Sequence, residues 1–148
     1  MVKLVSFDLN YLELSWRWLN DIEIKRLTDA SDFTKEEQLI WYKNLKEKKD
    51  YMIWGIEYNK IPVGSCGLKS ITELDCEYWG YIGEKEYWGK GIGKTIIDRM
   101  IVEAKKLQLV SIWLKVVNDN KRAIKLYERK GFLTINENHD ALFMRKML

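Results

Sequence analysis

The stretch that most restricts how this chain can fold is a glycine-rich turn, YWGKGIGKT, at residues 87–95. Its three glycines stand at alternate positions, and an amphipathic segment with apolar side chains at helical spacing follows directly. A glycine turn that opens a helix presents several main-chain N–H groups to one anion, and the missing side chains let that anion come close. The turn therefore predicts a phosphate-binding loop between a strand and a helix.

Three phosphate-binding motifs compete for this turn. The P-loop pattern GxxxxGK[ST] fails because its first glycine would fall at Trp88, and the dinucleotide pattern GxGxxG fails because its third would fall at Lys94. The third motif is an acyl-coenzyme A pyrophosphate loop, in which main-chain amides wrap the diphosphate while Lys90 and Lys94 add positive charge. A turn without any ligand is the remaining alternative, because short motifs also arise by chance.

The composition is that of one globular domain. The chain has 148 residues, of which 47% are hydrophobic, and no linker divides it, so residues 1–148 are predicted to form a single domain. A net charge of +3, spread along the chain, argues against a nucleic-acid partner. The sequence shows neither an apolar run of membrane-spanning length nor a signal peptide, which indicates a cytoplasmic protein without a membrane partner.

The metal-ligating residue types are sparse. Cys66 and Cys76 lack metal-ligand spacing and are predicted to be reduced core thiols. The single histidine, His139, lies in a polar run and is expected in a solvated turn. No metal site is therefore predicted.

The remaining segments predict an α/β fold. Strands are expected at residues 2–7, 51–58, 61–68, 76–83, 110–117, 132–138 and 141–148, the second and third joined by a tight hairpin at Asn59 and Lys60. Helices are expected at residues 11–19, from a capping box at Thr34, after the glycine turn, and at residues 120–130 before Gly131. Residues 21–33 are expected to be a loop or a pair of turns. This order predicts a single mixed, twisted sheet of about six to seven strands with helices on both faces.

Two stretches of the chain resemble one family. Residues 88–93, WGKGIG, resemble motif A of the GCN5-related N-acetyltransferases (the GNAT superfamily), whose signature is [QR]-x-x-G-x-[GA]. Trp88 replaces the usual Gln or Arg, as is familiar in the ribosomal-protein-acetyltransferase-like branch. Residues 120–132, NKRAIKLYERKGF, resemble motif B, whose positions are matched by Asn120, Ala123, Tyr127, Gly131 and Phe132. The resemblance covers about two thirds of the chain, and implies the GNAT fold with acetyl-CoA as acyl donor.

The resemblance also implies where acetyl-CoA binds. The strand that precedes the turn is expected to splay at its end, near Tyr81, Ile82 and Gly83, and to supply a main-chain amide that polarises the thioester carbonyl. Asn120 is expected to contact the coenzyme or to fix its loop, and it is also a candidate N-cap for the helix that follows. The diphosphate is expected on the main-chain amides of the turn, which are those of Trp88, Gly89, Lys90, Gly91, Ile92, Gly93 and Lys94.

Tyr127 is the predicted general acid. Acetyl transfer from a thioester to an amine requires a proton for the leaving thiolate. Tyr127 stands at the tyrosine position of motif B, where family members place the hydroxyl near the coenzyme A sulfur. Packing is the alternative role for Tyr127, because the neighbouring Leu126 indicates that this helix also contributes side chains to the core.

Glu77 is the predicted general base. It matches the acidic residue that many members carry on the strand before motif A, where it draws a proton through water. Strand alternation places Glu77 on one face with Trp79 and Tyr81, and two neighbouring aromatic rings would raise its pKa. The alternative is a solvated carboxylate at a sheet edge.

The resemblance implies that the N-terminal third supplies the acceptor side, where Asp29 and Trp41 are the predicted acceptor-binding residues. A carboxylate attracts an ammonium group and an aromatic ring stacks on a sugar or a base, although a core position is the alternative for Trp41. We expect direct acetyl transfer, in a ternary complex, to the primary amine of a small molecule of amino-sugar type. A protein amine acetyltransferase and a non-catalytic acyl-CoA-binding module remain open. A homodimer is allowed by the sequence but not required by it.

Overall fold

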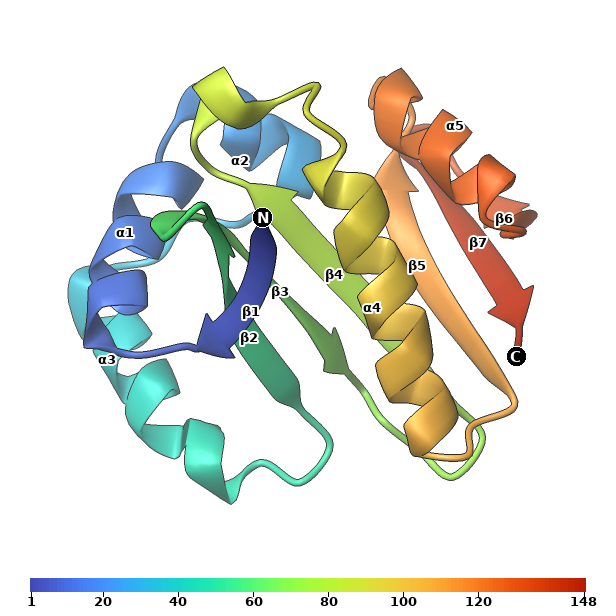
Figure 1. Cartoon of the computed structure of the whole chain (residues 1–148), viewed down its shortest axis with the longest axis horizontal. Coiled ribbons are helices and arrows are strands. Elements are labelled where there is room, and N and C mark those ends of the chain that lie inside the picture. The colour runs from blue at the N-terminus through green and yellow to red at the C-terminus, as the bar shows by residue number, and fades with distance from the viewer.

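The computed structural model shows one mixed sheet with helices on both faces (Figure 1). The strands lie in the order β1-β2-β3-β4-β5-β7-β6, and β4 and β5 are the parallel neighbours among otherwise antiparallel pairs. Their bounds are β1 (Val2–Ser6), β2 (Met52–Tyr58), β3 (Ile61–Lys69), β4 (Asp75–Ile82), β5 (Ser111–Val117), β6 (Leu133–Glu137) and β7 (Ala141–Met147). This architecture confirms the predicted fold class.

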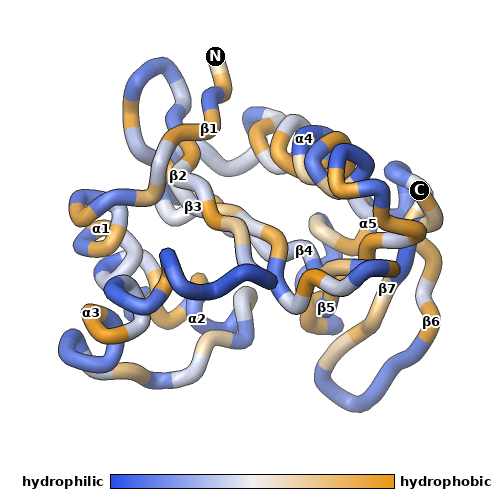
Figure 2. The backbone as a smooth tube through the Cα atoms, turned by 90° about the horizontal axis from the view of Figure 1, so that it is seen from below, coloured by the Kyte–Doolittle hydropathy of each residue, from blue (hydrophilic) through white to orange (hydrophobic).

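Helices from different parts of the chain cover the two faces of the sheet. Figures 1 and 2 show the three N-terminal helices over one face and the two C-terminal helices over the other. No helix combines the length and the apolar character needed to cross a membrane. The helices are α1 (Leu9–Leu19), α2 (Ile22–Thr28), α3 (Lys35–Asn44), α4 (Ile92–Lys106) and α5 (Lys121–Arg129), with short 3-10 turns at Leu45–Glu47 and Lys85–Tyr87.

Helix α2 lies where the sequence predicts only a loop or turns, so that prediction is wrong. The side chain of Asp21 accepts hydrogen bonds from the N–H groups of Glu23 and Ile24 at 3.0 and 3.1 Å and thereby caps the helix. Ile24 is buried, and the helix ends at Asp29, whose φ is +54°. A helix of 7 residues is too short to show a clear apolar period, so its capping residue was the available signal.

The predicted turn signals are otherwise confirmed. The capping box at Thr34 forms in both directions, because the Glu37 N–H donates to Thr34 Oγ1 and the Thr34 N–H donates to Glu37 Oε1. Asn59 and Lys60 have φ of +51° and +70°, as a two-residue hairpin turn between twisted strands requires. Gly131 follows α5 with φ +93°, which stops that helix.

The main core lies between α4 and the sheet. It consists of 18 buried residues, among them six from α4 and the alternate β5 residues Ile112, Leu114 and Val116. Cys66 and Cys76 are free thiols in this core, as predicted, and burial raises the pKa of both to about 12. The core holds α4 firmly, so the glycine turn at its N-terminus has a fixed position.

A second, aromatic cluster fills the face under α1 and α3. Seven rings form a closed circuit in which each ring contacts the next, with centroid separations of 5.9 to 6.4 Å. Edge-to-face, tilted and stacked pairs at such separations stabilise packing beyond the area that they bury. The members of this aromatic cluster, in order around the circuit, are Phe7, Tyr11, Trp18, Tyr81, Trp79, Tyr51 and Trp41.

The parallel strands β4 and β5 separate soon after they meet. Asp75, Cys76 and Glu77 pair with Ser111, Ile112 and Trp113, and no later residue of β4 has a partner in β5. Residues 78–82 of β4 therefore leave one edge of main-chain groups without a sheet partner; we call this region the splay. The predicted splay at the end of β4 is thus present in the structure.

We predict that replacing Gly83 by alanine destabilises the fold. The added Cβ would overlap the indole ring of Trp18, which is 2% exposed and therefore has no room to move. The cost is expected to be about 1–3 kcal/mol in the free energy of unfolding, measured by urea denaturation.

Gly93→Ala is the matched control. Its Cβ would lie 3.6 Å from Leu126 Cδ2, an ordinary contact, and alanine favours a helix over glycine by roughly 1 kcal/mol. Equal effects of the two substitutions would contradict this packing account.

Candidate active site

The glycine turn forms the uncapped N-terminus of α4. Gly89 and Gly91 have φ of +80° and +77°, a conformation that glycine adopts readily. Gly91 occupies the N-cap position, and no side chain caps the helix. Because the first N–H groups of a helix lack intrahelical partners, the amides of Ile92, Gly93 and Lys94 are available to a ligand.

The surroundings of this turn suit an anion such as a diphosphate. No atom lies within 4 Å of the position that a Cβ on Gly91 would take, so a ligand can reach the backbone there. The guanidinium of Arg122 lies 3.8 Å from the corresponding position on Gly89, and the adjacent Lys90 and Lys94 are exposed. Amides, helix dipole and cations thus favour a negative charge at the same place.

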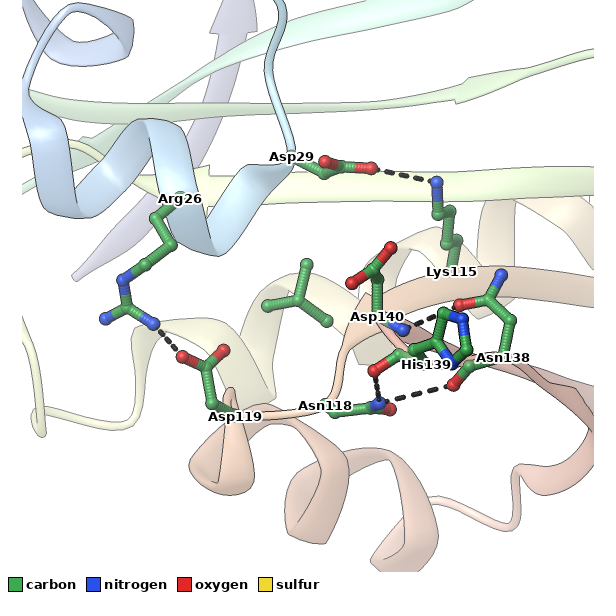
Figure 3. A pocket seen from close by; sticks show the side chains of 9 residues that line it. Arg26, Asp29, Lys115, Asn118, Asp119, Asn138, His139 and Asp140 are labelled. Atoms are coloured by element: carbon green, nitrogen blue, oxygen red, sulfur yellow. Dashed lines mark hydrogen bonds and ion pairs between the residues drawn. The ribbon is translucent and has the colours of Figure 1, made fainter.

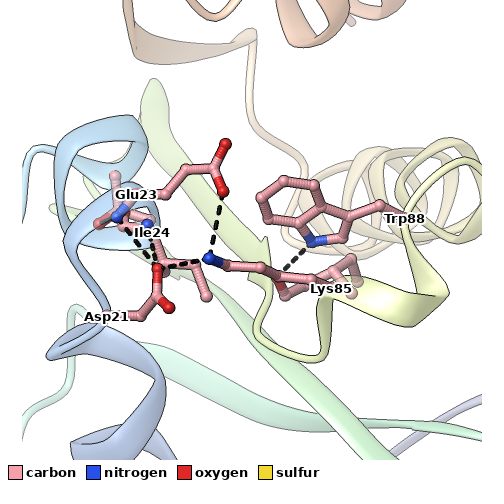
Figure 4. Close-up of polar contacts among 7 residues, drawn as sticks. Asp21, Glu23, Ile24, Lys85 and Trp88 are labelled. Atoms are coloured by element: carbon pink, nitrogen blue, oxygen red, sulfur yellow. Dashed lines mark hydrogen bonds and ion pairs between the residues drawn. The ribbon is translucent and has the colours of Figure 1, made fainter.

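Trp88 ties the turn to the end of β4. Its indole Nε1 donates a hydrogen bond to the carbonyl of Ile82 at 2.9 Å, a contact drawn in Figure 4. The tryptophan that replaces the family's Gln or Arg therefore has a structural role, which the sequence did not indicate. The bond holds the end of β4 and the splay close to the glycine turn.

Ionic contacts join the segment after β4 to the N-terminal helices. Lys85 Nζ lies 2.9 Å from Asp21 and 3.1 Å from Glu23 (Figure 4), and its hydrogen bond lowers the pKa of Asp21. Glu84 accepts hydrogen bonds from Arg17 and, at 2.6 Å, from the indole of Trp18. The turn that precedes α4 is thus attached to α1 and α2.

The splay offers main-chain groups from alternate residues of β4. The N–H of Gly83 donates to the Val63 carbonyl in β3 at 2.7 Å. Because main-chain groups of successive residues point to opposite edges of a strand, those of Tyr81 also face β3, whereas those of Gly80 and Ile82 face β5. Of the three residues predicted to supply an amide, only Ile82 has its N–H on the open edge, as Gly80 also has, which corrects the assignment to Tyr81 and Gly83.

Tyr127 reaches the splay from α5. Its ring packs against Tyr78 with centroids 6.2 Å apart and against Phe132 with centroids 5.9 Å apart. Burial raises the pKa of Tyr127 to about 12, so the phenol carries its proton at neutral pH. The predicted acid is therefore positioned by packing, and its hydroxyl retains a proton to give.

Glu77 lies on the opposite face of the sheet, at the closed end of the splay. Its side chain is 16% exposed, and burial is the main cause of its raised pKa. Lys69, whose Nζ lies 3.8 Å away, and Lys115 oppose that shift through their positive charges. The predicted rise in pKa is confirmed. Tyr127 and Glu77 thus flank one splay from its two faces.

Asn120 occupies the N-cap position of α5, but its side chain makes no capping hydrogen bond. Its main-chain N–H donates to the carbonyl of Val117 at 3.0 Å, which closes the loop after β5. The predicted capping bond is absent, and the amide side chain is free for other contacts.

A polar pocket of about 430 Å³ opens at the carboxyl end of β5 (Figure 3). Two ion pairs cross it, one from Arg26 to Asp119 and one of 2.8 Å from Lys115 to Asp29. The predicted acceptor residue Asp29 therefore lines a real cavity. The lining residues are Arg26, Asp29, Lys115, Val117, Asn118, Asp119, Asn138, His139 and Asp140.

The turn between β6 and β7 supplies one wall of this pocket. Asn118 Nδ2 donates to the carbonyls of Asn138 and His139 at 3.3 and 2.7 Å, which holds the turn against the end of β5. Figure 2 shows this turn as a hydrophilic stretch. The sequence predicts only that His139 lies in a solvated turn. It gives no sign that this polar turn lies beside residues 118–120. That connection depends on the pairing of β5 with β7.

Trp41 does not line this pocket. It belongs to the aromatic cluster, where it packs edge-to-face on Phe7 and Tyr51. The two predicted acceptor residues therefore serve different regions, and the alternative of a packing role applies to Trp41.

Residues 14–132 match the model of the acetyltransferase (GNAT) family. The chain belongs to this family. The acetyltransferase PseH of Campylobacter jejuni is 26% identical over 144 residues, which cover 95% of this chain and 90% of PseH. An N-acetyltransferase 9-like protein of Caenorhabditis briggsae is 28% identical over 149 residues, which cover 90% of this chain and 75% of that protein.

Solved structures share the fold. The crystal structure of Campylobacter jejuni PseH in complex with acetyl coenzyme A matches with a TM-score of 0.78 and 20% identity, over 99% of each chain. Spermidine N-acetyltransferase from Vibrio cholerae, in complex with CoA and spermine, matches with a TM-score of 0.86 and 22% identity, over 99% of this chain and 95% of that one. The predicted family, fold and enzyme class are thus confirmed.

We predict that Gly91→Ala weakens acetyl-CoA binding much more than it weakens the fold. A Cβ at this position meets no protein atom, so the structural cost is the backbone strain of a positive φ, about 1–2 kcal/mol. The same Cβ would occupy the space that a diphosphate needs, and a loss of affinity of about tenfold or more is expected in titration calorimetry. Unchanged affinity would contradict the assignment of this turn.

Proposed function

We propose that this chain transfers the acetyl group of acetyl-CoA to the primary amine of a small, hydroxyl-rich molecule of the amino-sugar type. The observation that carries the proposal is the polar pocket at the carboxyl end of β5, beside the splay and lined by paired charges. Ligands of open α/β sheets bind outside the carboxyl ends of parallel strands. Such a pocket suits a ligand with several hydrogen-bonding groups.

The charge pattern of the pocket favours an amino sugar over a polyamine. Arg26 and Lys115 contribute two positive charges, each already paired with an acid. Asp140 is the pocket carboxylate without a cationic partner, so it would accept hydrogen bonds from the hydroxyl groups of a sugar whose amine extends toward Glu77. A polyamine would bring several ammonium groups to a pocket with a single unpaired carboxylate, so most of those groups would lack a counter-charge there.

Acetyl-CoA fits the residues that the turn and the splay provide. The amides of Gly91 to Lys94, with Arg122 nearby, would hold its diphosphate, and the unpaired edge of β4 would hold its pantetheine arm. When bound, acetyl-CoA supplies an acetyl group activated as a thioester. The matching fold of PseH, solved with acetyl coenzyme A, supports this assignment.

Two residues of the chain would carry out the proton transfers of the reaction. Glu77, as carboxylate, accepts a proton from the acceptor ammonium group, directly or through water, which frees the nitrogen lone pair for attack. Tyr127 gives its phenolic proton to the leaving sulfur, and the second proton that the attacking nitrogen loses returns to Tyr127 through water. The pairing of β4 with β5 up to Glu77 and the packing of α5 fix both groups relative to the splay, so the reacting atoms meet in one orientation.

The proposal is tested by measuring thiol release with acetyl-CoA and a panel of amines. We expect amino sugars, including nucleotide-linked ones, to show kcat/KM at least about tenfold above spermidine and N-terminal peptides, a difference of about 1.4 kcal/mol in transition-state binding. A preference for spermidine or for peptides would contradict the acceptor assignment, and acetyl-CoA binding without any transfer would contradict the enzymatic role.

Within the same assay, Asp140→Asn is expected to raise KM for the preferred amine by about tenfold, because it removes a charged hydrogen-bond partner, and to change kcat little. Asp32→Asn is the matched control, because Asp32 is exposed, pairs with Lys25 and lies outside the pocket. Equal effects of the two variants would show that the pocket does not bind the acceptor.

The pH dependence of kcat/KM tests Glu77. A base must be deprotonated, so activity is expected to rise with pH through the raised pKa of Glu77, and Glu77→Gln should lower kcat about 100-fold and remove this acid limb. Lys69→Met removes a positive charge that lowers the pKa of Glu77, so the acid limb should move to higher pH.

Lys106→Met is the control for that shift, since Lys106 is exposed and pairs with Glu103 on α4. An acid limb that stays in place in Lys69→Met would show that another group acts as the base.

A further inference from the structure

A second phenol stands opposite Tyr127 and has no role in the reaction described above. Tyr78 is the first β4 residue beyond the part that pairs with β5, and it is 6% exposed. Its ring meets the ring of Tyr127 at an interplanar angle of 75°, with centroids 6.2 Å apart. The two tyrosines, from β4 and α5, therefore face each other across one side of the splay.

The hydroxyl of Tyr78 lies over Gly80. A Cβ added to Gly80 would overlap the Tyr78 oxygen and would lie 3.0 Å from its Cζ. Gly80 is also a residue whose main-chain groups face β5 across the splay, as its place in the β3–β4 register dictates. Glycine at this position therefore leaves room for the Tyr78 hydroxyl directly beside a residue whose main-chain N–H faces the unpaired edge.

Neither tyrosine hydroxyl has a partner within the protein. Of the two unpaired side-chain polar atoms that are fully buried, Trp79 Nε1 and Arg145 Nε, neither belongs to Tyr78 or Tyr127. Each hydroxyl therefore has a proton that it can donate to a ligand. Burial, reinforced by the proximity of Tyr127, raises the pKa of Tyr78, so it too keeps its proton at neutral pH.

We infer that Tyr78 is a further catalytic residue, whose hydroxyl, together with the N–H of Gly80, donates a hydrogen bond to the thioester carbonyl oxygen. Negative charge grows on this oxygen as the amine nitrogen bonds to the carbonyl carbon, and fixed donors stabilise that charge. The carbon–sulfur bond then breaks, and the sulfur takes the Tyr127 proton. Tyr78 keeps its own proton throughout. The inference rests on the proposed use of acetyl-CoA. It assigns the Tyr78 hydroxyl to the carbonyl oxygen and the Tyr127 hydroxyl to the sulfur.

Infrared spectroscopy of bound acetyl-CoA, labelled with ¹³C at the acetyl carbonyl and without any amine, tests this inference. Donors to the carbonyl oxygen weaken the C=O bond, so the band of the wild-type complex should lie below that of free acetyl-CoA. Tyr78→Phe should move the band back toward the free value, whereas Tyr127→Phe should leave it in place. A band that is identical in wild type and Tyr78→Phe would overturn the inference.

Kinetics provide a second, independent reading. Removing one donor to a developing oxyanion lowers kcat by about 10- to 100-fold or more, so Tyr78→Phe should reduce kcat with little change in KM for acetyl-CoA. Gly80→Ala should lower kcat similarly, because its Cβ displaces the Tyr78 hydroxyl. An effect on KM alone, or none on kcat, would count against Tyr78.

Two controls separate this inference from folding and from the proposed function. Tyr42→Phe removes a hydroxyl from a ring that packs on Phe7, on the other face of the sheet, and should change neither the band nor kcat. Thermal melting of each variant reports any loss of fold. If the wild type binds acetyl-CoA but acetylates no amine, the proposed function fails, while the infrared comparison still decides the role of Tyr78.

Discussion

The early separation of β4 from β5 is the constraint on which the rest of the structure depends. After Glu77 pairs with Trp113, β4 keeps β3 as its one neighbour, and its other edge carries main-chain groups without a sheet partner. Unpaired buried main-chain groups are costly, so a folded protein retains them only where something else satisfies them. Trp88 satisfies the carbonyl of Ile82, and the remaining groups are open to a ligand that can run between two strands.

The two faces of the sheet contribute different chemistry to that opening. The main core under α4 fixes the glycine turn and, with α5, brings the protonated phenols of Tyr78 and Tyr127 together. The other face carries Glu77 and Lys115, which lead toward the polar pocket. In the proposed reaction, the acetyl donor and the acceptor amine meet at the splay. The contacts of Glu84 and Lys85 with α1 and α2 attach the segment after β4 to the N-terminal helices.

Much of this arrangement can be predicted from the sequence, because its strongest signals are local. The glycine turn, the Thr34 capping box, the hairpin at Asn59 and the alternation along β4 each depend on neighbouring residues, and the structure has all of them. What the sequence could not provide depends on long-range pairing. The polar pocket joins α2 to two distant turns, Trp88 bonds back to a strand end, and Tyr78 becomes notable only where its hydroxyl crosses Gly80. Helix α2 could not be predicted because it has a single buried side chain, Ile24, and one apolar position cannot show the helical spacing of apolar residues.

The central claim is that one splay holds the thioester between a diphosphate-binding turn and a polar acceptor pocket. A crystal structure of the chain with coenzyme A tests it most directly. The account predicts the diphosphate on the amides of residues 91–94 and the pantetheine along the unpaired edge of β4. It also predicts the sulfur within hydrogen-bonding reach of Tyr127, with the pocket around Asp29 still open. A diphosphate bound away from the turn, or a pantetheine arm that lies outside the splay, would contradict it.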